Sequence, residues 1–338
     1  MLKFPAQCVI ALLFVSTSMA QARMQPPDQT GDPGSVQPTA TPTVVKKATS
    51  SPAKSKPRRK SARQIAVADK PSFGDQQGLQ YTQDALELKS NAAFVIDQEN
   101  AQVLFEKNAT VSLPIASITK LMTSLVVLEA NQDMDEIIDV TTDDVDTEKG
   151  SSSRLKVGSR LKRSDMLHIA LMSSENRAAS SLGRHYPGGL SACVAAMNAK
   201  AAALGMLDTH YVDSTGLNSH NVASAQDLAK LVNAAYTQPL IRQYSTDTRY
   251  AVYPGGRPLE YMSSNRLTSS SDWEIGLQKT GYISEAGRCL VMQAMIGGRA
   301  VVMVFLDSKG KYSRFADAGR IRNWLSTFRA PVTTMASQ

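Results

Sequence analysis

Apolar residues recur along the chain with two different spacings, which divide residues 82–328 into three regions. Near the start, two β-rich runs flank a polar turn at residues 98–101, a pattern that predicts a hairpin. The middle region has apolar residues at helical spacing, and the last region returns to strands. We expect a helix from near Ser117, a strand at 136–141, and helices at 163–186 (broken at Ser173-Ser174), 189–206 and 224–236, followed by strands at 274–283, 288–296 and 299–308 and a helix at 313–328.

The order of these elements predicts the fold class. Gly297-Gly298 joins the last two strands, and a two-residue glycine connection is typical of a hairpin. Strands at both ends of the region, with helices between them, indicate one antiparallel sheet that collects strands from both chain ends around an inserted helical region. The expected class is therefore α+β, or mixed.

The first 80 residues do not resemble the rest of the chain. Residues 1–20 have a positive start at Lys3, a short apolar run and an A-x-A-like end at 18–20, which is the pattern of a secretory signal peptide. Residues 21–80 are rich in Pro, Lys, Ser and Thr and lack the apolar residues needed to offset chain entropy, so we expect a disordered linker. The folded domain is expected at 81–338. No later stretch is apolar enough to be a membrane anchor after signal removal.

The formal net charge of +7 belongs to the N-terminal region. Residues 1–80 hold 11 Lys and Arg against 4 Asp, whereas residues 81–338 hold 26 basic and 26 acidic residues. A neutral folded region without a nucleic-acid motif argues against a nucleic-acid partner. A basic tail is most simply a solvated spacer, with anionic polymers or membrane surfaces as the other possibility.

Cysteine and histidine usage gives no metal signal. Signal removal leaves Cys193 and Cys289, both in apolar runs, so we expect two buried free thiols, although export permits a disulfide. The four histidines do not show a metal-binding spacing. We expect no metal site.

Ser117 and Lys120 form an S-x-x-K pair that differs from four other copies of the same pattern. Those copies begin at Ser51, Ser153, Ser159 and Ser308, in the linker or in polar stretches, whereas Ser117 heads a long apolar helix. Positions i and i+3 share a helix face, so Lys120 can reach Ser117. Burial would lower the pKa of the lysine and make it a usable base, and the helix start favours a developing oxyanion. The pair predicts an activated serine nucleophile.

Two further motifs follow at informative distances. Ser174-Glu175-Asn176 gives S-x-N at a helix break, 57 residues after Ser117, and Lys279-Thr280-Gly281 follows Ser174 by 105 residues. S-x-N is weak evidence alone, because it also occurs at Ser219 and Ser263. K-T-G occurs once, but a lysine in a strand is by default a solvated edge charge. The order of the three motifs is that of the penicillin-binding and serine β-lactamase-like superfamily.

The chain resembles the low-molecular-mass D-alanyl-D-alanine peptidases of serine peptidase family S11, and within them the D,D-endopeptidases of the penicillin-binding protein 7 type. The resemblance rests on "LPIASITKLMT", "LMSSENRAA", "YVDSTGLNSHNVASAQDLAKL", "LQKTGY" with "AGRCLVM", and "GKYSRFADAGRIRNW", and covers residues 85–330. It implies the penicillin-binding protein / serine β-lactamase-like fold.

The resemblance implies roles for the motif residues. Ser117 would be the nucleophile, Lys120 its base, Ser174 a proton relay to the leaving amine, and Asn176 a holder of the substrate amide.

It also implies a substrate-binding strand. Lys279 and Thr280 would bind a substrate carboxylate or peptide oxygen, Gly281 would permit close approach, and the backbone N–H of Tyr282 would share the oxyanion hole with that of Ser117.

The implied function is hydrolysis of D-alanyl cross-links in periplasmic peptidoglycan, with β-lactams as covalent inhibitors and no cofactor. Regulatory partners are not indicated. A D,D-carboxypeptidase with the same residues is the nearest alternative, but only 57 residues follow Gly281, too few for the appended domain of the larger carboxypeptidases. A class A β-lactamase would need an E-x-x-x-N carboxylate after Asn176, which is not found, and a non-catalytic scaffold would not need three intact motifs.

Overall fold

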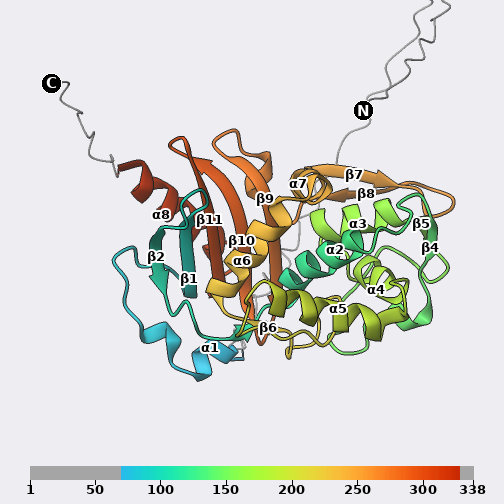
Figure 1. The fold of residues 1–338 in the computed structure, drawn as a ribbon, viewed down its shortest axis with the longest axis horizontal. Coiled ribbons are helices and arrows are strands. Elements are labelled where there is room, and N and C mark those ends of the chain that lie inside the picture. The colour runs from blue at the N-terminus through green and yellow to red at the C-terminus, as the bar shows by residue number, and fades with distance from the viewer. Residues whose placement is uncertain (1–69, 328–338) are drawn as a thin grey trace, which may run out of the picture. The chain divides into compact units, whose positions relative to one another are not determined.

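The computed structural model describes residues 70–327, which lie within one compact unit of the chain (Figure 1). The expected signal peptide and residues 21–69 of the expected linker are outside the described residues. The strands of the main sheet are β1 (Ser90–Asp97), β2 (Val103–Lys107), β9 (Glu274–Ile283), β10 (Gly287–Ile296) and β11 (Arg299–Ser308). The helices are α1 (Phe73–Gln76), α2 (Thr119–Glu129), α3 (Arg163–Met172), α4 (Asn176–Arg184), α5 (Gly189–Ala203), α6 (Ala225–Tyr236), α7 (Pro239–Thr246) and α8 (Ser313–Thr327), and the short strand pairs are β3 (Leu113–Pro114) with β6 (Val222–Ala223), β4 (Ile137–Asp139) with β5 (Arg160–Lys162), and β7 (Arg249–Val252) with β8 (Leu259–Met262).

The five-stranded sheet has the order β2-β1-β11-β10-β9, and each neighbouring pair is antiparallel. The last strand of the chain therefore lies beside the first, as the element order predicted. The motif strand β9 is at the edge of the sheet, where its free side faces the helical region (Figure 1). The α+β class and the sheet built from both chain ends are confirmed.

Both faces of the sheet are covered, and β11 shows how the sequence permits this. Val302, Val304 and Leu306 belong to the core shared with the helical region, whereas Val301 and Met303 belong to a second core. Successive strand residues point to opposite faces, so a continuous apolar run buries both. Helix α6 packs on the first face and α8 on the second.

The helical region follows the predicted pattern closely. The helix expected near Ser117 begins with a 3₁₀ turn at Ala116–Ile118 and continues as α2. Helices α3 and α4 are separated at Ser173-Ser174, as the pattern predicted. The side chain of Ser224 caps α6 by accepting a hydrogen bond from the Asp227 backbone N–H.

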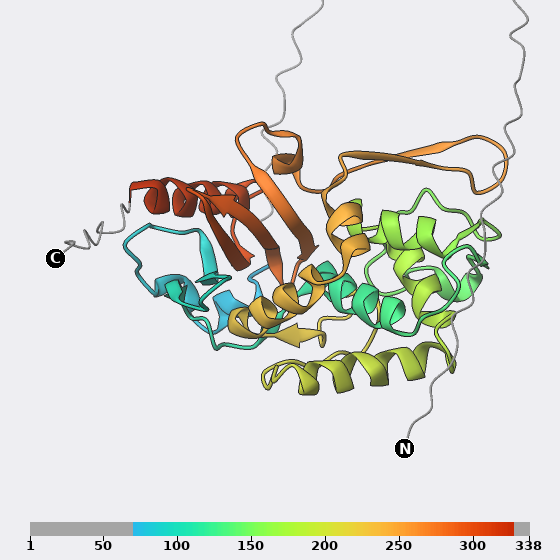
Figure 2. The ribbon, with the colours of Figure 1, turned by 45° about the horizontal axis from the view of Figure 1, so that its top comes forward.

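Two ordered segments were not expected from the sequence. The α7 helix and the β7–β8 hairpin fill the stretch before β9, and the hairpin lies along the helical region beside α3 (Figure 2).

The second unexpected segment lies upstream of Thr82, where the fold was expected to begin. The hydroxyl of Ser72 donates to the buried Asp307 carboxylate at 2.6 Å, and the Phe73 backbone N–H donates to the Glu285 carbonyl at 2.9 Å. These contacts attach the last residues of the expected linker to the β9–β10 and β11 ends of the sheet.

Candidate active site

Ser117 lies on a sharp backbone turn at the edge of β9. The preceding residue, Ala116, has φ of 48°, a left-handed conformation that is uncommon for a residue with a side chain. Two contacts hold it there: the Thr119 hydroxyl donates to the Ala116 carbonyl at 2.8 Å, and Gly216 packs so closely that a Cβ on it would lie 2.0 Å from that oxygen. A strained backbone held by its surroundings is typical of a functional position.

Lys120 is fully buried and has three hydrogen-bond partners. Its Nζ lies 2.8 Å from Ser117 Oγ, 2.8 Å from Asn176 Oδ1 and 2.6 Å from the Thr215 carbonyl oxygen. A neutral amine has two hydrogens and one lone pair. Asn176 Oδ1 and the Thr215 carbonyl can only accept, so they take the two hydrogens, and the lone pair is left for the Ser117 hydroxyl.

Burial lowers the pKa of Lys120 from 10.5 to about 7, against the opposing charges of Asp213 and Glu175. A buried ammonium loses hydration, which disfavours the charged form. Near neutral pH a large fraction of Lys120 is therefore the free base that can accept the Ser117 proton.

Ser174 and Lys279 form the other side of the site. Lys279 Nζ donates to Ser174 Oγ at 2.8 Å and to the Thr280 carbonyl at 2.9 Å. Its pKa is well below the usual range, chiefly because of burial and then because of the nearby cations Lys120 and Arg314. Ser174 has φ of 66°, so it is the second residue with a strained backbone in the site after Ala116, and its side chain is a hydroxyl.

Strand β9 brings the remaining predicted residues alongside Ser117. A Cβ on Gly281 would lie 2.9 Å from the Ile115 carbonyl oxygen and 3.1 Å from the Ser117 backbone nitrogen. Glycine therefore allows the edge strand to approach the nucleophile's backbone closely. The Thr280 hydroxyl contacts Ser264 Oγ at 2.7 Å, and the ring of Tyr282 is half exposed.

The structure thus assembles all eight residues singled out from the sequence, through the 3₁₀ turn before α2, α2 itself, the α3–α4 break with the start of α4, and β9. Asn176 is the first residue of α4, and its Nδ2 donates to Ser151 Oγ at 2.9 Å. Of the five S-x-x-K pairs, the one at Ser51 lies outside the described residues. Among the other four, only Ser117 and Lys120 are hydrogen-bonded to each other while the lysine also bonds to Asn176 of the S-x-N motif.

Sequence reasoning did not assign roles to two carboxylates that support the site. Asp213 accepts from the backbone N–H groups of Thr215 (2.5 Å), Gly216 (2.6 Å) and Asn218 (3.0 Å), which shapes the loop that offers the Thr215 carbonyl to Lys120. The D-x-T-G-x-N spacing within "YVDSTGLNSHN" is a turn signal that could have indicated this role.

The second carboxylate, Glu175, is buried at the start of α4. It accepts from Ser153 Oγ at 2.6 Å and from the Tyr261 hydroxyl at 3.3 Å, and it caps the Arg177 backbone N–H. Tyr261 comes from the unpredicted β7–β8 hairpin, and Arg154 stacks over its ring at 4.1 Å. Glu175 therefore ties the hairpin to the S-x-N motif.

A cleft of about 600 Å³ opens beside Ser174. Its walls are formed by residues 152–154 of a loop, residues 173–176 at the α3–α4 break and residues 260–262 of the β7–β8 hairpin. Its lining is polar and open on one side, which suits an extended peptide more than a small apolar ligand.

The described part of the chain has no group of three or more His, Cys, Asp or Glu side chains able to hold a metal ion. Cys193 and Cys289 are buried free thiols. Within residues 70–327, no helix is long and apolar enough to cross a membrane.

Comparisons with known proteins agree with this geometry. Residues 79–310 match the model of peptidase family S11, described as D-alanyl-D-alanine carboxypeptidase. The chain belongs to this family.

Its similarity to family members extends over most of the described fold. It is 48% identical to a D-alanyl-D-alanine endopeptidase of Pseudomonas aeruginosa and 45% identical to one of Escherichia coli, in each case over 71% of this chain and 78% of the relative. The structure of the Streptomyces K15 DD-transpeptidase is similar with a TM-score of 0.66 at 26% identity, covering 70% of this chain and 97% of that one. Penicillin-binding protein D2 of Listeria monocytogenes, in its ampicillin-bound form, is similar with a TM-score of 0.63 at 30% identity, covering 71% and 98%.

Proposed function

We propose that this S11 family member is a serine D,D-endopeptidase that hydrolyses D-alanyl cross-links in peptidoglycan through an acyl-enzyme on Ser117. The observation that carries the proposal is the hydrogen bond between Ser117 and a buried lysine whose pKa is about 7. Relatives at 45–48% identity are named endopeptidases, which supports that reaction over removal of a terminal residue.

Acylation begins when the Ser117 oxygen attacks the carbonyl carbon of the D-alanyl peptide bond. Lys120 accepts the hydroxyl proton, because its lone pair faces Ser117 while its two hydrogens are held by Asn176 and Thr215. The developing oxyanion is stabilised by the backbone N–H groups of Ser117 and Tyr282. Gly281 permits the close approach of the strand and the turn that this arrangement needs.

The tetrahedral intermediate collapses with breakage of the C–N bond. Ser174 relays the proton to the leaving amine nitrogen, and its hydrogen bond to Lys279 orients the hydroxyl for that transfer. Asn176 holds the substrate amide. Its Nδ2, which donates to the Ser151 hydroxyl in this structure, would donate to a substrate carbonyl instead. Lys279 and Thr280 bind a carboxylate or peptide oxygen of the substrate.

Hydrolysis then releases Ser117. A water molecule attacks the ester carbonyl, Lys120 accepts one of its protons, and the C–O bond to Ser117 breaks as that oxygen regains a proton. The residues named here complete the cycle with no metal or organic cofactor.

The same chemistry makes β-lactams covalent inhibitors, because opening of the lactam ring leaves an acyl group on Ser117. The relative from Listeria is known in an ampicillin-bound form. We further propose that the protein is exported by residues 1–20 and works in the periplasm, where its substrate lies.

A carboxypeptidase with the same site is the second candidate, because the family model and relatives at 26–31% identity carry that name. The deciding experiment gives the purified protein a D,D-cross-linked muropeptide dimer and a pentapeptide monomer together, with Ser117→Ala as control, and follows both by mass spectrometry. Loss of the dimer with the monomer intact is the expected result. Loss of terminal D-Ala alone would replace the endopeptidase assignment by the carboxypeptidase one, and no change in either would favour a scaffold.

A further inference from the structure

A groove of about 390 Å³ next to the substrate-binding strand is lined by four cations, and we call it the cationic groove. The cations come from three elements: the 3₁₀ turn Arg266–Ser269, strand β10, and the β11–α8 connection with the start of α8. They are Arg266, Arg288, Lys311 and Arg314.

Aromatic rings hold these cations in place. Arg266 and Lys311 both lie over the ring of Tyr312, at 5.1 and 5.4 Å, and Arg288 lies over the ring of Tyr282 at 4.3 Å. Among residues 70–327, none of the four groove cations forms an ion pair with a carboxylate. Their charges therefore remain available for an anion.

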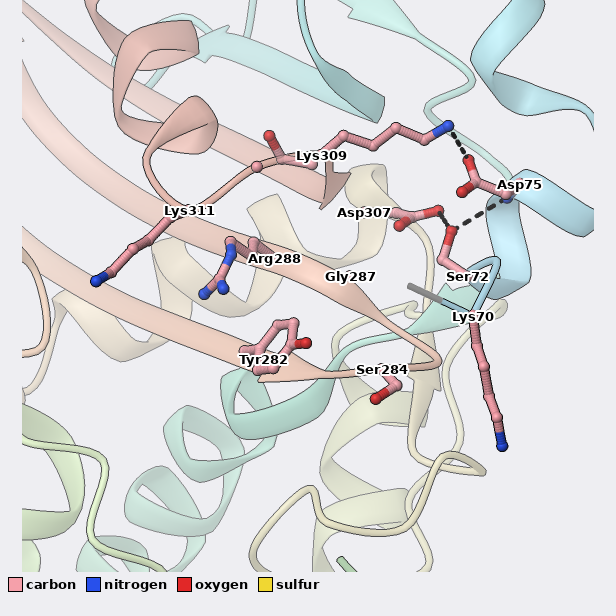
Figure 3. A pocket seen from close by; sticks show the side chains of 12 residues that line it. Lys70, Ser72, Asp75, Tyr282, Ser284, Gly287, Arg288, Asp307, Lys309 and Lys311 are labelled. Atoms are coloured by element: carbon pink, nitrogen blue, oxygen red, sulfur yellow. Dashed lines mark hydrogen bonds and ion pairs between the residues drawn. The ribbon is translucent and has the colours of Figure 1, made fainter. Parts of the chain in front are cut away.

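A neighbouring lysine shows the contrast. Lys309 is two residues from Lys311 and pairs with Asp75 at 2.9 Å. Figure 3 shows Lys309 reaching toward Asp75, whereas Lys311 and Arg288 point away from it. The same loop thus carries one lysine that pairs with a carboxylate and one that, among the described residues, does not.

Arg314 adds an independent sign of a missing anion. Arg314 is buried, with an exposed fraction of 7%, and its Nε is a buried donor that has no partner in the described part of the chain. Burial and the like charge of Arg288 lower the pKa of Arg314 to about 10. Buried unpaired donors are costly, and the start of α8 adds a positive helix end at the same place.

A series of contacts leads from the leaving amine to this groove. Ser174, the proposed donor to that amine, is hydrogen-bonded to Lys279, and the adjacent Thr280 contacts Ser264 at 2.7 Å. Ser264 lines the cationic groove. The cationic groove therefore adjoins the strand residues that lie next to the proposed proton donor.

We propose that the cationic groove binds the carboxylates of the leaving stem peptide in a cross-linked substrate, with Arg266, Arg288 and Lys311 as specificity-determining residues. The proposal rests on the endopeptidase function proposed above. A D-alanyl cross-link joins two acidic peptides, so cleavage releases a long acidic amine, whereas cleavage of a terminal D-Ala releases one amino acid. The groove thus recognises the part of the substrate that distinguishes the two reactions.

The test uses the Arg266→Gln/Lys311→Gln double variant of the full protein. Lys309→Gln is the matched control. It removes an exposed positive charge from the loop that carries Lys311, but this charge is already neutralised by Asp75. The Arg266→Lys/Lys311→Arg variant keeps both charges. The substrates are synthetic cross-linked peptides whose carboxylates are free, amidated on the leaving stem only, or amidated on the acyl stem only.

We expect the double variant to lose about tenfold or more in kcat/KM on the free-acid substrate, since about 1.4 kcal/mol of lost charge-assisted binding is a factor of ten. Amidation of the leaving stem should lower the wild-type kcat/KM similarly and abolish the difference between wild type and double variant. Amidation of the acyl stem should leave that difference unchanged. The Lys309→Gln and charge-conserving variants should stay within about twofold of wild type on the free acid.

Acylation of Ser117 by a fluorescent penicillin is measured on every variant and should be unchanged. If the wild type fails to cleave any cross-linked substrate, the proposed function itself fails. If the wild type cleaves it and the double variant is unaffected, or loses activity equally on all three substrates, only the groove proposal is overturned. Loss of binding to anionic lipid vesicles without any substrate effect would also overturn it, because the groove would then be a membrane contact.

Discussion

The acylation rate of Ser117 should follow the deprotonation of Lys120, with a midpoint near pH 7. The lysine is fully buried, and burial lowers its pKa from 10.5 to about 7. Only the neutral amine can accept the serine proton, so the rate is proportional to the neutral fraction.

The expected size of the effect follows from that pKa. A group with a pKa of about 7 is roughly 9% neutral at pH 6, half neutral at pH 7 and roughly 91% neutral at pH 8. The second-order rate constant for acylation by a fluorescent penicillin should therefore rise about tenfold from pH 6 to pH 8 and then level off. With an ordinary lysine pKa, the rate would continue to rise about tenfold per pH unit up to about pH 10.

Glu175→Gln tests the electrostatic part of this reasoning. The Glu175 carboxylate raises the pKa of Lys120, so neutralising Glu175 should move the midpoint of the rate profile to lower pH. At pH 6 the variant should therefore reach a larger fraction of its own plateau rate than wild type does. Glu129→Gln, at the far end of the same α2 helix, is the matched control and should not move the midpoint. Stopped-flow fluorescence from pH 5 to pH 10 measures all three proteins. A wild-type rate that still rises above pH 9, or a flat profile, would refute Lys120 as the base.

Four further outcomes follow from the structure. Lys120→Met should lower the acylation rate by about 10³-fold or more while the protein stays folded. Between pH 7 and 10.5 the unfolded chain binds more protons at Lys120 than the native protein does, so wild-type stability rises with pH in that window. Lys120→Met lacks this titration. The melting temperature of Lys120→Met minus that of wild type should therefore increase as pH falls from 10 to 7. Gly281→Ala should slow acylation by about tenfold or more with a smaller effect on melting temperature, because its Cβ would lie 2.9 Å from the Ile115 carbonyl oxygen. Cys193 and Cys289 are buried and their pKa values are raised to about 12, so a thiol reagent should label them at least about a hundredfold more slowly in native protein than in denaturant.

The sequence was sufficient for most of the fold because its apolar spacing matches the burial of each element. Strands β9 and β11 have the predicted bounds, and β11 buries the long apolar run that a sheet covered on two faces requires. The β7–β8 hairpin was not predicted, because its residues are half exposed and carry no clear alternation. The α1 segment was assigned to the linker because its attachment depends on Ser72 meeting a carboxylate 235 residues away.

The site was predictable as three motifs but not as a supporting structure. The helix spacing of Ser117 and Lys120 guarantees their proximity, whereas nothing local indicates that the Thr215 carbonyl completes the lysine's hydrogen bonds. Asp213 has a local turn signal, because its backbone partners lie two to five residues away. Glu175 looked like an ordinary helix-start residue, and its role depends on contacts with Ser153 and Tyr261, which a single sequence does not reveal.

The residues hardest to justify by stability alone are the ones that mark function in this chain. Lys120 and Lys279 are fully buried lysines; burial lowers the pKa of each, and the charge of Lys120 lowers the pKa of Lys279 further. Arg314 lowers the pKa of Lys279 further, and its Nε is a buried donor without a partner among residues 70–327. A fold selected only for stability would replace such groups with apolar side chains of similar volume. Asp213 and Glu175 partly offset the cost at Lys120, and the proposed acidic substrate would supply a carboxylate for the Arg314 donor that residues 70–327 leave unpartnered.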